Sequence, residues 1–154
     1  MKLTTRGRYA VTAVLDVALN EATGPVSLAD ISKRQGISQS YLEQLFAKLR
    51  REGLLKSARG PGGGYSLACL PKQITVGQVI NALDENIDAT QCAGKQNCHD
   101  GARCLTHQLW TDLSKAIACF LDGVTIESLM TSRDVKEETI CRMIVKNKEE
   151  VEAI

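Results

Sequence analysis

Hydrophobic residues recur at helical spacing in three stretches of the first half of the chain. In the first stretch, between Gly7 and Asn20, the apolar positions are Tyr9, Val11, Val14, Leu15, Ala18 and Leu19. Steps of three and four residues keep apolar side chains on one face of a helix, so the pattern predicts a helix here. We expect Gly24-Pro25 to end this element.

The second stretch predicts a short helix with a defined start and end. Ser27 and Asp30 have the spacing of a capping box, which satisfies the free backbone amides of a first helical turn. The helix is therefore expected to run from about Leu28 to Gln35 and to stop at Gly36.

A third helix is predicted directly afterwards, with Ile37-Ser38 at its start and Gly53 at its end. Its i, i+3, i+4, i+7 stripe, which faces a core, consists of Leu42, Leu45, Phe46 and Leu49. Two helices joined by a three- or four-residue turn that contains Gly are typical of a helix-turn-helix.

The opposite face of the third helix is polar, and the first turns of a recognition helix reach base edges in the major groove. Gln44 can pair with adenine, Ser40 can contact a phosphate or a base, and Glu43 can accept from cytosine N4 while repelling phosphates. An ordinary solvated helix face is the alternative. The residues expected to contact DNA on this helix are Ser38, Gln39, Ser40, Tyr41, Glu43, Gln44 and Lys48.

A glycine-rich turn follows the third helix. Residues 54–59 and 65–68 flank the run GPGGG at 60–64, which predicts a β-hairpin wing. A nucleotide-binding loop is disfavoured because no Gly-Lys-Ser/Thr follows, whereas a plain surface hairpin stays open as an alternative. The wing residues expected to contact a phosphate or a narrow minor groove are Arg59, Gly60, Gly62 and Gly63.

The net charge is only +1, but its distribution is uneven. Residues 1–65 carry ten Lys and Arg against five Asp and Glu, whereas residues 66–154 carry nine against thirteen. This asymmetry suggests a nucleic-acid-binding module joined to a module with another task, although an excess of this size also occurs on ordinary solvated surfaces.

The pattern beyond Pro71 predicts two more helices. A capping box at Thr75 and Gln78 precedes a helix through Val76, Val79, Ile80 and Leu83. A long helix is expected from near Cys104, with a broad apolar face made of Leu105, Leu109, Trp110, Leu113, Ala116, Ile117, Phe120 and Leu121. Such a face suits another subunit, so we expect a homodimer that presents two recognition helices to one face of DNA. The alternative is that it packs on the winged helix of its own chain.

Half of the six cysteines and both histidines fall in one polar stretch. The run is Cys-x5-Cys-x5-Cys-x2-His, formed by Cys92, Cys98, Cys104 and His107. Thiolates and imidazoles bind zinc, copper and iron–sulfur clusters, and the surrounding residues include almost nothing apolar to bury. We therefore predict a metal site, with Cys104 and His107 together on the first turn of the long helix. Three unpaired thiols in a loop are the alternative.

The competing ligand is His99 and the competing metal is zinc. His99 lies inside the loop next to Cys98, so His107 is preferred. Zinc sites favour Cys-x2-4-Cys knuckles, which neither x5 gap supplies. Three further cysteines are expected to be buried or incidental thiols: Cys69, Cys119 and Cys141.

The sequence gives no signal for export or membrane insertion. Its first apolar stretch is broken by Asp16 and lacks a cleavage site, and no segment is long and apolar enough to span a bilayer. We expect the chain in a reducing cytoplasm, where thiols stay available as metal ligands. Both histidines belong to the metal run, so no separate nucleophile and base are paired and an enzyme is not expected.

Four motifs occur in one order along about residues 1–130. They are MKLTTRGRYAVTAVLDVAL, ISQSYLEQLFAKLRREGL, RGPGGGY and the Cys/His run with the Leu-Trp after it. Together they resemble the winged-helix family of bacterial iron–sulfur cluster regulators. The resemblance implies a homodimeric repressor and activator of iron–sulfur cluster assembly genes, holding a [2Fe-2S] cluster through Cys92, Cys98, Cys104 and His107.

The resemblance also implies that cluster-free and cluster-bound forms read different DNA motifs, with Glu43 involved in the discrimination. The iron–sulfur assembly machinery would donate the cluster. A zinc-stabilised regulator, or a relative with a [4Fe-4S] cluster that senses nitric oxide or redox state, is the alternative.

We therefore predict a mainly α fold with a small β-hairpin wing. Residues 1–83 should form a winged helix-turn-helix DNA-binding domain, residues 84–130 a cluster-binding loop and a long dimerisation helix, and residues 131–154 a mobile tail.

Overall fold

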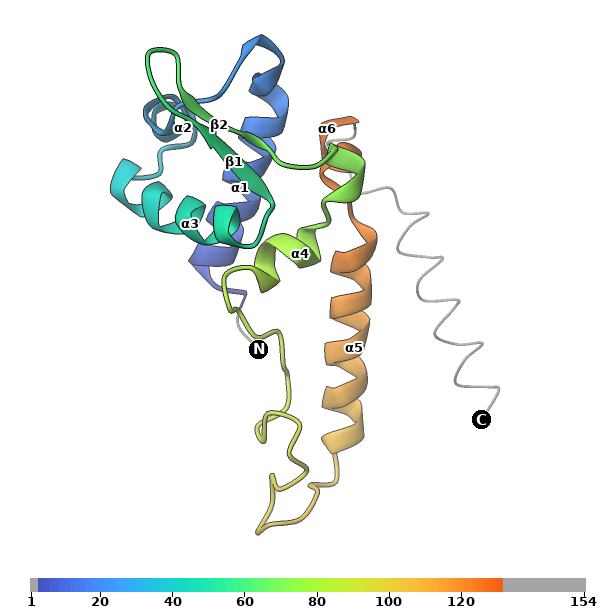
Figure 1. The fold of residues 1–154 in the computed structure, drawn as a ribbon. Helices are drawn as coiled ribbons and strands as arrows, with labels where there is room; N and C mark the ends of the chain where they lie inside the picture. Colours follow the sequence, from blue (N-terminus) through green and yellow to red (C-terminus); the bar gives the residue numbers. More distant parts are fainter. Residues whose placement is uncertain (1–2, 132–154) are drawn as a thin grey trace.

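The computed structural model describes residues 3–131 and has the predicted architecture, mainly helical with one two-stranded antiparallel hairpin (Figure 1). Its elements are α1 (Thr5–Asn20), α2 (Leu28–Gln35), α3 (Gln39–Arg51), β1 (Leu55–Ala58), β2 (Gly64–Leu67), α4 (Val76–Asn81), α5 (His107–Gly123) and α6 (Ile126–Thr131). Short 3-10 helices cover Glu21–Thr23 and Pro71–Gln73. The predicted mobile tail lies outside the described residues, except for Thr131, which ends α6.

Local sequence signals set the boundaries of the helix-turn-helix. The Ser27 hydroxyl caps α2 by accepting from the Asp30 amide at 3.2 Å, and Ser38 caps α3 in the same way. Gly36 ends α2 at a φ of 66°, a left-handed conformation that strains residues with a Cβ. The boundaries predicted for α2 are therefore confirmed.

The first three helices and the hairpin share one hydrophobic core. The hairpin pairs Leu55 with Leu67, and both are buried. Tyr65 of β2 meets Phe46 of α3 edge to face at 4.9 Å and exchanges two backbone hydrogen bonds with Val26. The predicted core-facing stripe of α3 is confirmed, because each of its side chains is at most 1% exposed: Leu42, Leu45, Phe46 and Leu49.

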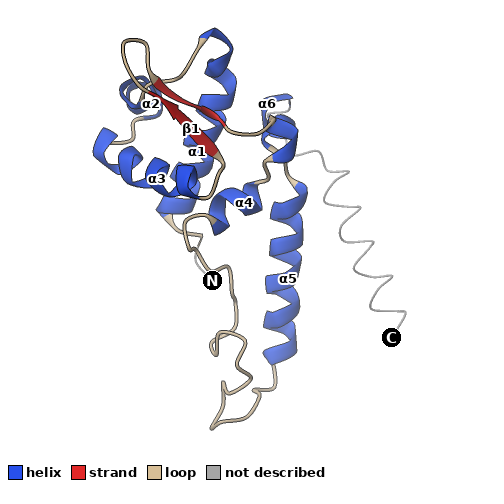
Figure 2. Cartoon of the chain, in the orientation of Figure 1, coloured by secondary structure: helices blue, strands red, loops and turns tan. Residues whose placement is uncertain are grey.

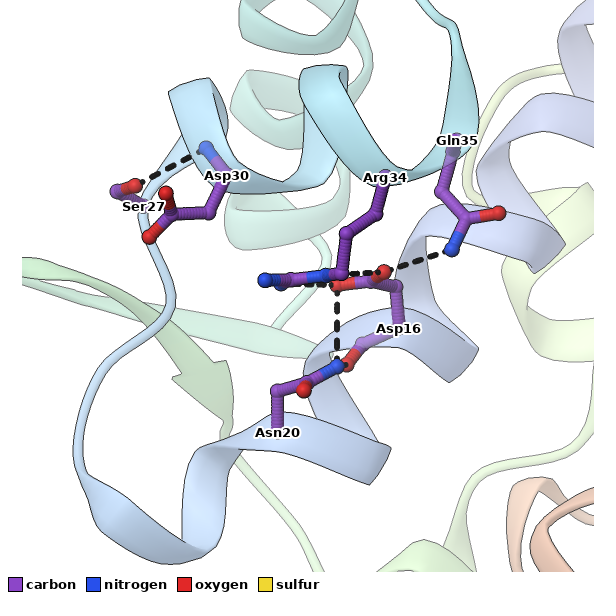
Figure 3. A network of polar contacts seen from close by, with 6 residues as sticks. All are labelled: Asp16, Asn20, Ser27, Asp30, Arg34 and Gln35. Carbon is purple, nitrogen blue, oxygen red and sulfur yellow. Dashed lines mark hydrogen bonds and ion pairs between the residues drawn. The ribbon is translucent and has the colours of Figure 1, made fainter.

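A buried carboxylate joins α1 to α2 (Figure 3). Asp16 is 2% exposed and accepts hydrogen bonds from Arg34 at 2.7 and 3.0 Å, from Gln35 at 2.7 Å and from Asn20 at 3.4 Å. Burial acts to raise the pKa of Asp16, but the hydrogen bonds from Arg34 and Gln35 outweigh it and hold this pKa below its ordinary value. The network fixes α2, and with it the turn into α3.

The second half of the chain forms an arm that leaves the winged helix and returns to it. α4 packs on both α1 and α5, while α6 places the fully buried Ile126 in the core beside α1. Backbone hydrogen bonds of 2.9 Å join Val76 to Val124 and Ile126 to Ile74, next to the C-terminal end of α5. The segment between α4 and α5 is an irregular loop that runs beside α5, away from the winged helix (Figure 2).

Two helix boundaries in the arm differ from expectation. α5 begins at His107 instead of near Cys104, because Thr106 has non-helical backbone angles and no side-chain cap. α4 ends at Asn81, and Leu83 is fully buried in the turn that follows. Apolar spacing indicates which residues are buried, but it does not say where a helix stops.

Three smaller expectations concern thiols and membranes. Cys69 and Cys119 are exposed, so of the two options given for these thiols, burial is wrong for both and only the incidental role is left, while Cys141 lies outside the described residues. α6 was not predicted. No helix within residues 3–131 has the length and apolar character needed to cross a membrane.

Candidate metal centre and nucleic-acid interface

The loop between α4 and α5 brings three of the four predicted metal ligands together at the start of α5. His107 is 4% exposed, and Cys92, which comes from the loop, is 8% exposed. The Sγ atoms of Cys92 and Cys98 lie 3.6 and 3.5 Å from Nδ1 of His107. All three ligand atoms lie within 4.8 Å of one another, so soft donors of this kind can share one metal centre.

Cys104 lies beside this group without joining it. Its backbone amide donates to Sγ of Cys98 at 3.1 Å, and its own Sγ lies 3.9 Å from the Thr106 hydroxyl. The prediction that Cys104 and His107 share the first turn of α5 is wrong, since only His107 is on the helix. An amide that donates to a cysteine sulfur is one of the contacts that tune the reduction potential of a cluster.

A hollow of about 210 Å³ adjoins the ligand group and is lined by Thr90, Gln91, Cys98, His99, Cys104, Thr106, His107 and Trp110. Cys98, Cys104 and His107 therefore border one common space. The competing imidazole, His99, is 76% exposed, lies 3.8 Å from Asp100, and is absent from the converging group described above. The convergence of Cys92, Cys98 and His107, with Cys104 bordering the hollow, fits a metal centre with thiolate and imidazole ligands.

Hydrogen bonds around the ligands influence the thiolate form, which is the form of cysteine that binds metals. Burial acts to raise the pKa of Cys92, but the Gln96 amide and the Thr90 hydroxyl outweigh it and lower this pKa. A hydrogen bond with Cys98 lowers the pKa of Cys104. For Cys98 itself, the Cys104 amide acts to lower the pKa, but the neighbouring thiols raise it overall.

Two threonines support the site and were not predicted. The Thr106 hydroxyl accepts from Nε1 of Trp110 at 3.1 Å, which holds the indole beside the hollow. The Thr90 hydroxyl accepts from the Gly94 amide at 3.0 Å and so fixes the turn around Cys92. Thr90 lies two residues before Cys92, and Thr106 lies two residues after Cys104. These positions are their only sequence signal.

The outer face of α3 carries the predicted DNA-contacting residues, of which the exposed ones include Gln39, Ser40, Glu43 and Gln44. Ser38 is the N-cap of the helix. Tyr41 is half-buried, and its ring meets that of Tyr9 on α1 edge to face at 5.9 Å. Lys48 is half-buried and donates to the Asp84 carboxylate at 3.0 Å, a contact that the sequence pattern did not indicate.

The wing is a tight turn attached to α3. A Cβ on Gly63 would collide with the carbonyl oxygen of Ala58, so the turn accepts only glycine there. Arg59 is exposed at the end of β1. Arg50 of α3 donates to the Ser57 hydroxyl at 3.0 Å, which fixes the hairpin relative to the helix that carries the predicted base contacts.

Known proteins resemble this chain over nearly its whole length. Residues 3–132 match the Rrf2 family, described as iron-dependent transcriptional regulator. The chain is 62% identical over 137 residues to the HTH-type transcriptional regulator IscR of Aliivibrio salmonicida, covering 89% of this chain and 82% of that protein. The corresponding protein of Yersinia enterocolitica is 59% identical over 137 residues, covering 89% and 84%.

Solved structures share the fold of both the winged helix and the arm. IscR of T. potens matches with a TM-score of 0.72 at 37% identity, covering 87% of this chain and 89% of that one. CymR (YrzC), the global cysteine regulator of B. subtilis, matches with a TM-score of 0.74 at 34% identity, covering 85% and 97%.

Proposed function

This chain belongs to the Rrf2 family of iron-dependent transcriptional regulators, and from that premise we propose that it senses an iron–sulfur cluster and binds operator DNA as a homodimer. It represses and activates genes of iron–sulfur cluster assembly according to whether its own cluster is bound. The observation that carries the proposal is the convergence of Cys92, Cys98 and His107 on an arm attached to a winged helix. Such regulation is a coupling free energy between two sites.

The proposed cofactor is a [2Fe-2S] cluster held by Cys92, Cys98, Cys104 and His107. Cys104 supplies the fourth ligand from the loop, since it borders the same hollow as Cys98 and His107. When bound, the cluster supplies a redox-active group that oxidants remove and the assembly machinery replaces. An imidazole in place of a thiolate removes a negative charge from the ligand set, which raises the reduction potential and weakens retention. The ligand set therefore suits a sensor.

The proposed DNA contacts come from α3 and the wing. Contacts to base edges carry specificity, whereas contacts to phosphates fix the position of the protein on the duplex. We assign base contacts to Glu43 and Gln44, because both are exposed on the first two turns of α3. The remaining contacts, to phosphates, sugars or the minor groove, come from Ser38, Gln39, Ser40, Tyr41, Lys48, Arg59, Gly60, Gly62 and Gly63.

The arm is the proposed dimer interface. Leu105 lies two residues before α5 and is fully exposed, and on α5 itself Leu109 is 57% exposed and Trp110 38% exposed. Several large apolar side chains on one helix mark a contact surface, whereas a single one does not. Pairing through α5 about a twofold axis places two recognition helices on successive turns of the duplex.

We divide the chain into two functional units. Residues 1–83 bind DNA, and residues 84–130 bind the cluster and the second subunit, although α6 returns from the second unit to the core of the first. Operator DNA and a cluster donated by the assembly machinery imply a cytoplasmic protein.

Anaerobic purification tests the cofactor, by visible absorption, electron paramagnetic resonance, and iron and sulfide counts. We expect the chromophore to disappear in Cys92→Ala, Cys98→Ala and Cys104→Ala while circular dichroism stays unchanged, because the ligands lie outside the apolar core. Cys119→Ala is the control, since Cys119 is exposed on α5 and does not border the hollow. Bound zinc without colour would favour the zinc alternative, and four irons per site would favour a [4Fe-4S] cluster.

A further inference from the structure

Two consecutive residues after α4 attach the cluster-binding loop to the DNA-binding helices. The Asp84 carboxylate accepts from Nζ of Lys48 on α3 at 3.0 Å. The Glu85 carboxylate accepts from the hydroxyl of Thr4, the residue that caps α1. Within residues 3–131, these are the hydrogen bonds and ion pairs that join the segment 84–106 to α3 or to the start of α1. A displacement of the loop therefore acts first on these two contacts.

The backbone gives this attachment a defined geometry. Asp84 has a φ of 57°, in the left-handed region that Asp and Asn adopt more readily than most residues, and its amide donates to the Asn81 carbonyl at 3.1 Å. Glu85 packs directly on α1, because a Cβ on Gly7 would lie only 2.5 Å from its Oε2. The sharp turn after α4 thus directs one carboxylate to α3 and the next to α1.

The Asp84 carboxylate lies among basic side chains of the DNA-binding half. The hydrogen bond and the charge of Lys48 hold the pKa of Asp84 below its ordinary value, and the charges of Arg6 and Arg51 act in the same direction. The carboxylate is 85% exposed, so its ion pair adds little to the stability of the fold. Its main effect is to neutralise one cation of the recognition helix, which a DNA phosphate would otherwise attract.

We propose that Asp84 is a positioning residue for Lys48, and that their ion pair transmits the state of the cluster-binding loop to the affinity for DNA. This inference rests on the proposed function, since it requires both DNA binding and a cluster on residues 92–107. In one arrangement Asp84 holds Lys48. In the other, an ordered cluster loop draws Asp84 away, and Lys48 contacts a phosphate. The cluster then acts as the ligand of the second arrangement, and DNA binding favours cluster retention by the same factor.

Asp84→Asn separates charge from shape, because Asn keeps the left-handed turn and the size of the side chain. The probe is a duplex selected by the wild-type protein from random-sequence DNA, titrated at several salt concentrations. We expect cluster-free Asp84→Asn to bind about 1.4- to five-fold more tightly than cluster-free wild type, which is the range for an exposed ion pair. The slope of log affinity against log salt should steepen by about one phosphate contact, and the two cluster-loaded proteins should bind equally.

Two further variants show whether the effect acts through Lys48. In a Lys48→Gln background, Asp84→Asn should change neither the affinity nor the salt slope. Glu52→Gln is the matched control, because Glu52 is an exposed carboxylate at the C-cap of α3 that forms no hydrogen bond or ion pair with the loop within residues 3–131. It removes the same charge, so any gain in affinity should be equal with and without the cluster.

Two results would overturn the inference while leaving the proposed function intact. One is equal affinity of cluster-free wild type and Asp84→Asn, and the other is a gain that persists without Lys48. Asp84→Gly, which also accepts the left-handed turn, replaces Asp84→Asn if the latter does not fold. If the affinity of the wild-type protein for the duplex did not depend on the cluster, both this inference and the proposed function would be overturned.

Discussion

Asp16→Asn measures how much the buried carboxylate between α1 and α2 stabilises the helix-turn-helix. Asn keeps the shape but turns one acceptor oxygen, shared by Arg34 and Gln35, into a donor. A hydrogen bond to a charged group contributes about 1.5–3 kcal/mol, and at least one such bond is lost together with the charge. Because Arg34 is 39% exposed, water replaces part of the contact that it loses, and this limits the cost. We expect the free energy of unfolding to fall by about 2–3 kcal/mol.

The pH dependence identifies the carboxylate as the cause. The pKa of Asp16 is lower in the folded protein than in the unfolded chain, where the pKa of Asp is about 3.9. Ionised Asp16 therefore stabilises the fold fully above that unfolded value, and the contribution is lost as the pH falls through the folded pKa. The difference between wild type and Asp16→Asn should stay constant from about pH 7 to about pH 5 and shrink below about pH 4.

Urea unfolding of the cluster-free protein, followed by circular dichroism, gives both quantities. The transition midpoint should fall while its slope stays the same, because the surface exposed on unfolding does not change. Asp30→Asn on α2 is the control, since this exposed residue carries the same charge and should cost less than about 1 kcal/mol. A loss below about 1 kcal/mol for Asp16→Asn, or one that does not depend on pH, would refute the reasoning.

Further predictions concern DNA binding and assembly. Arg59→Ala should weaken binding to all duplexes and flatten its salt dependence, whereas Gln44→Ala should cost about 1–3 kcal/mol at one base pair in a competition assay. Equal losses on specific and random DNA would contradict that assignment of roles. Glu43→Ala should let the cluster-free protein bind the operator class that otherwise requires the cluster, because an unsatisfied carboxylate beside phosphate penalises binding. Titrations of both cluster-free proteins at one salt concentration test this, and an unchanged operator preference in the variant would exclude the mechanism. Leu109→Glu should yield monomers in sedimentation because it places a charge in the apolar face of α5, and a dimeric variant would locate the interface elsewhere.

Elements whose boundaries depend on neighbouring residues could be predicted from the sequence. Ser27 and Gly36 delimit α2 through contacts within one turn, and the α3 stripe requires only its own period to identify its buried face. The start of α5 could not be predicted, because Thr106 makes no side-chain cap and apolar spacing continues through the exposed Leu105. Local signals therefore set the winged helix more completely than the arm.

Contacts between distant segments had no sequence signal. The partners Lys48 and Asp84 are separated by 36 residues, and the burial of Ile126 depends on α6 returning to α1. Within the candidate metal centre, the spacing of cysteines and histidine predicted which residues take part. It did not predict that Cys104 stays in the loop, because that depends on its contacts with Cys98 and Thr106.

The position of the backbone hydrogen bonds that hold the arm makes α5 a lever. Its 17 residues extend about 25 Å from an anchored end beside Val124 to a free end at His107. A rotation of about 4° at the pivot moves the free end by nearly 2 Å, whereas a shift of about 1 Å at the free end turns the pivot by only about 2°. Small changes in how the winged helix sits on DNA are thus amplified at His107, the one predicted ligand on α5. Because DNA binding and cluster binding favour the same arrangement, an operator that fits the protein more closely would retain the cluster longer, so the choice of promoter would set how long a cluster survives.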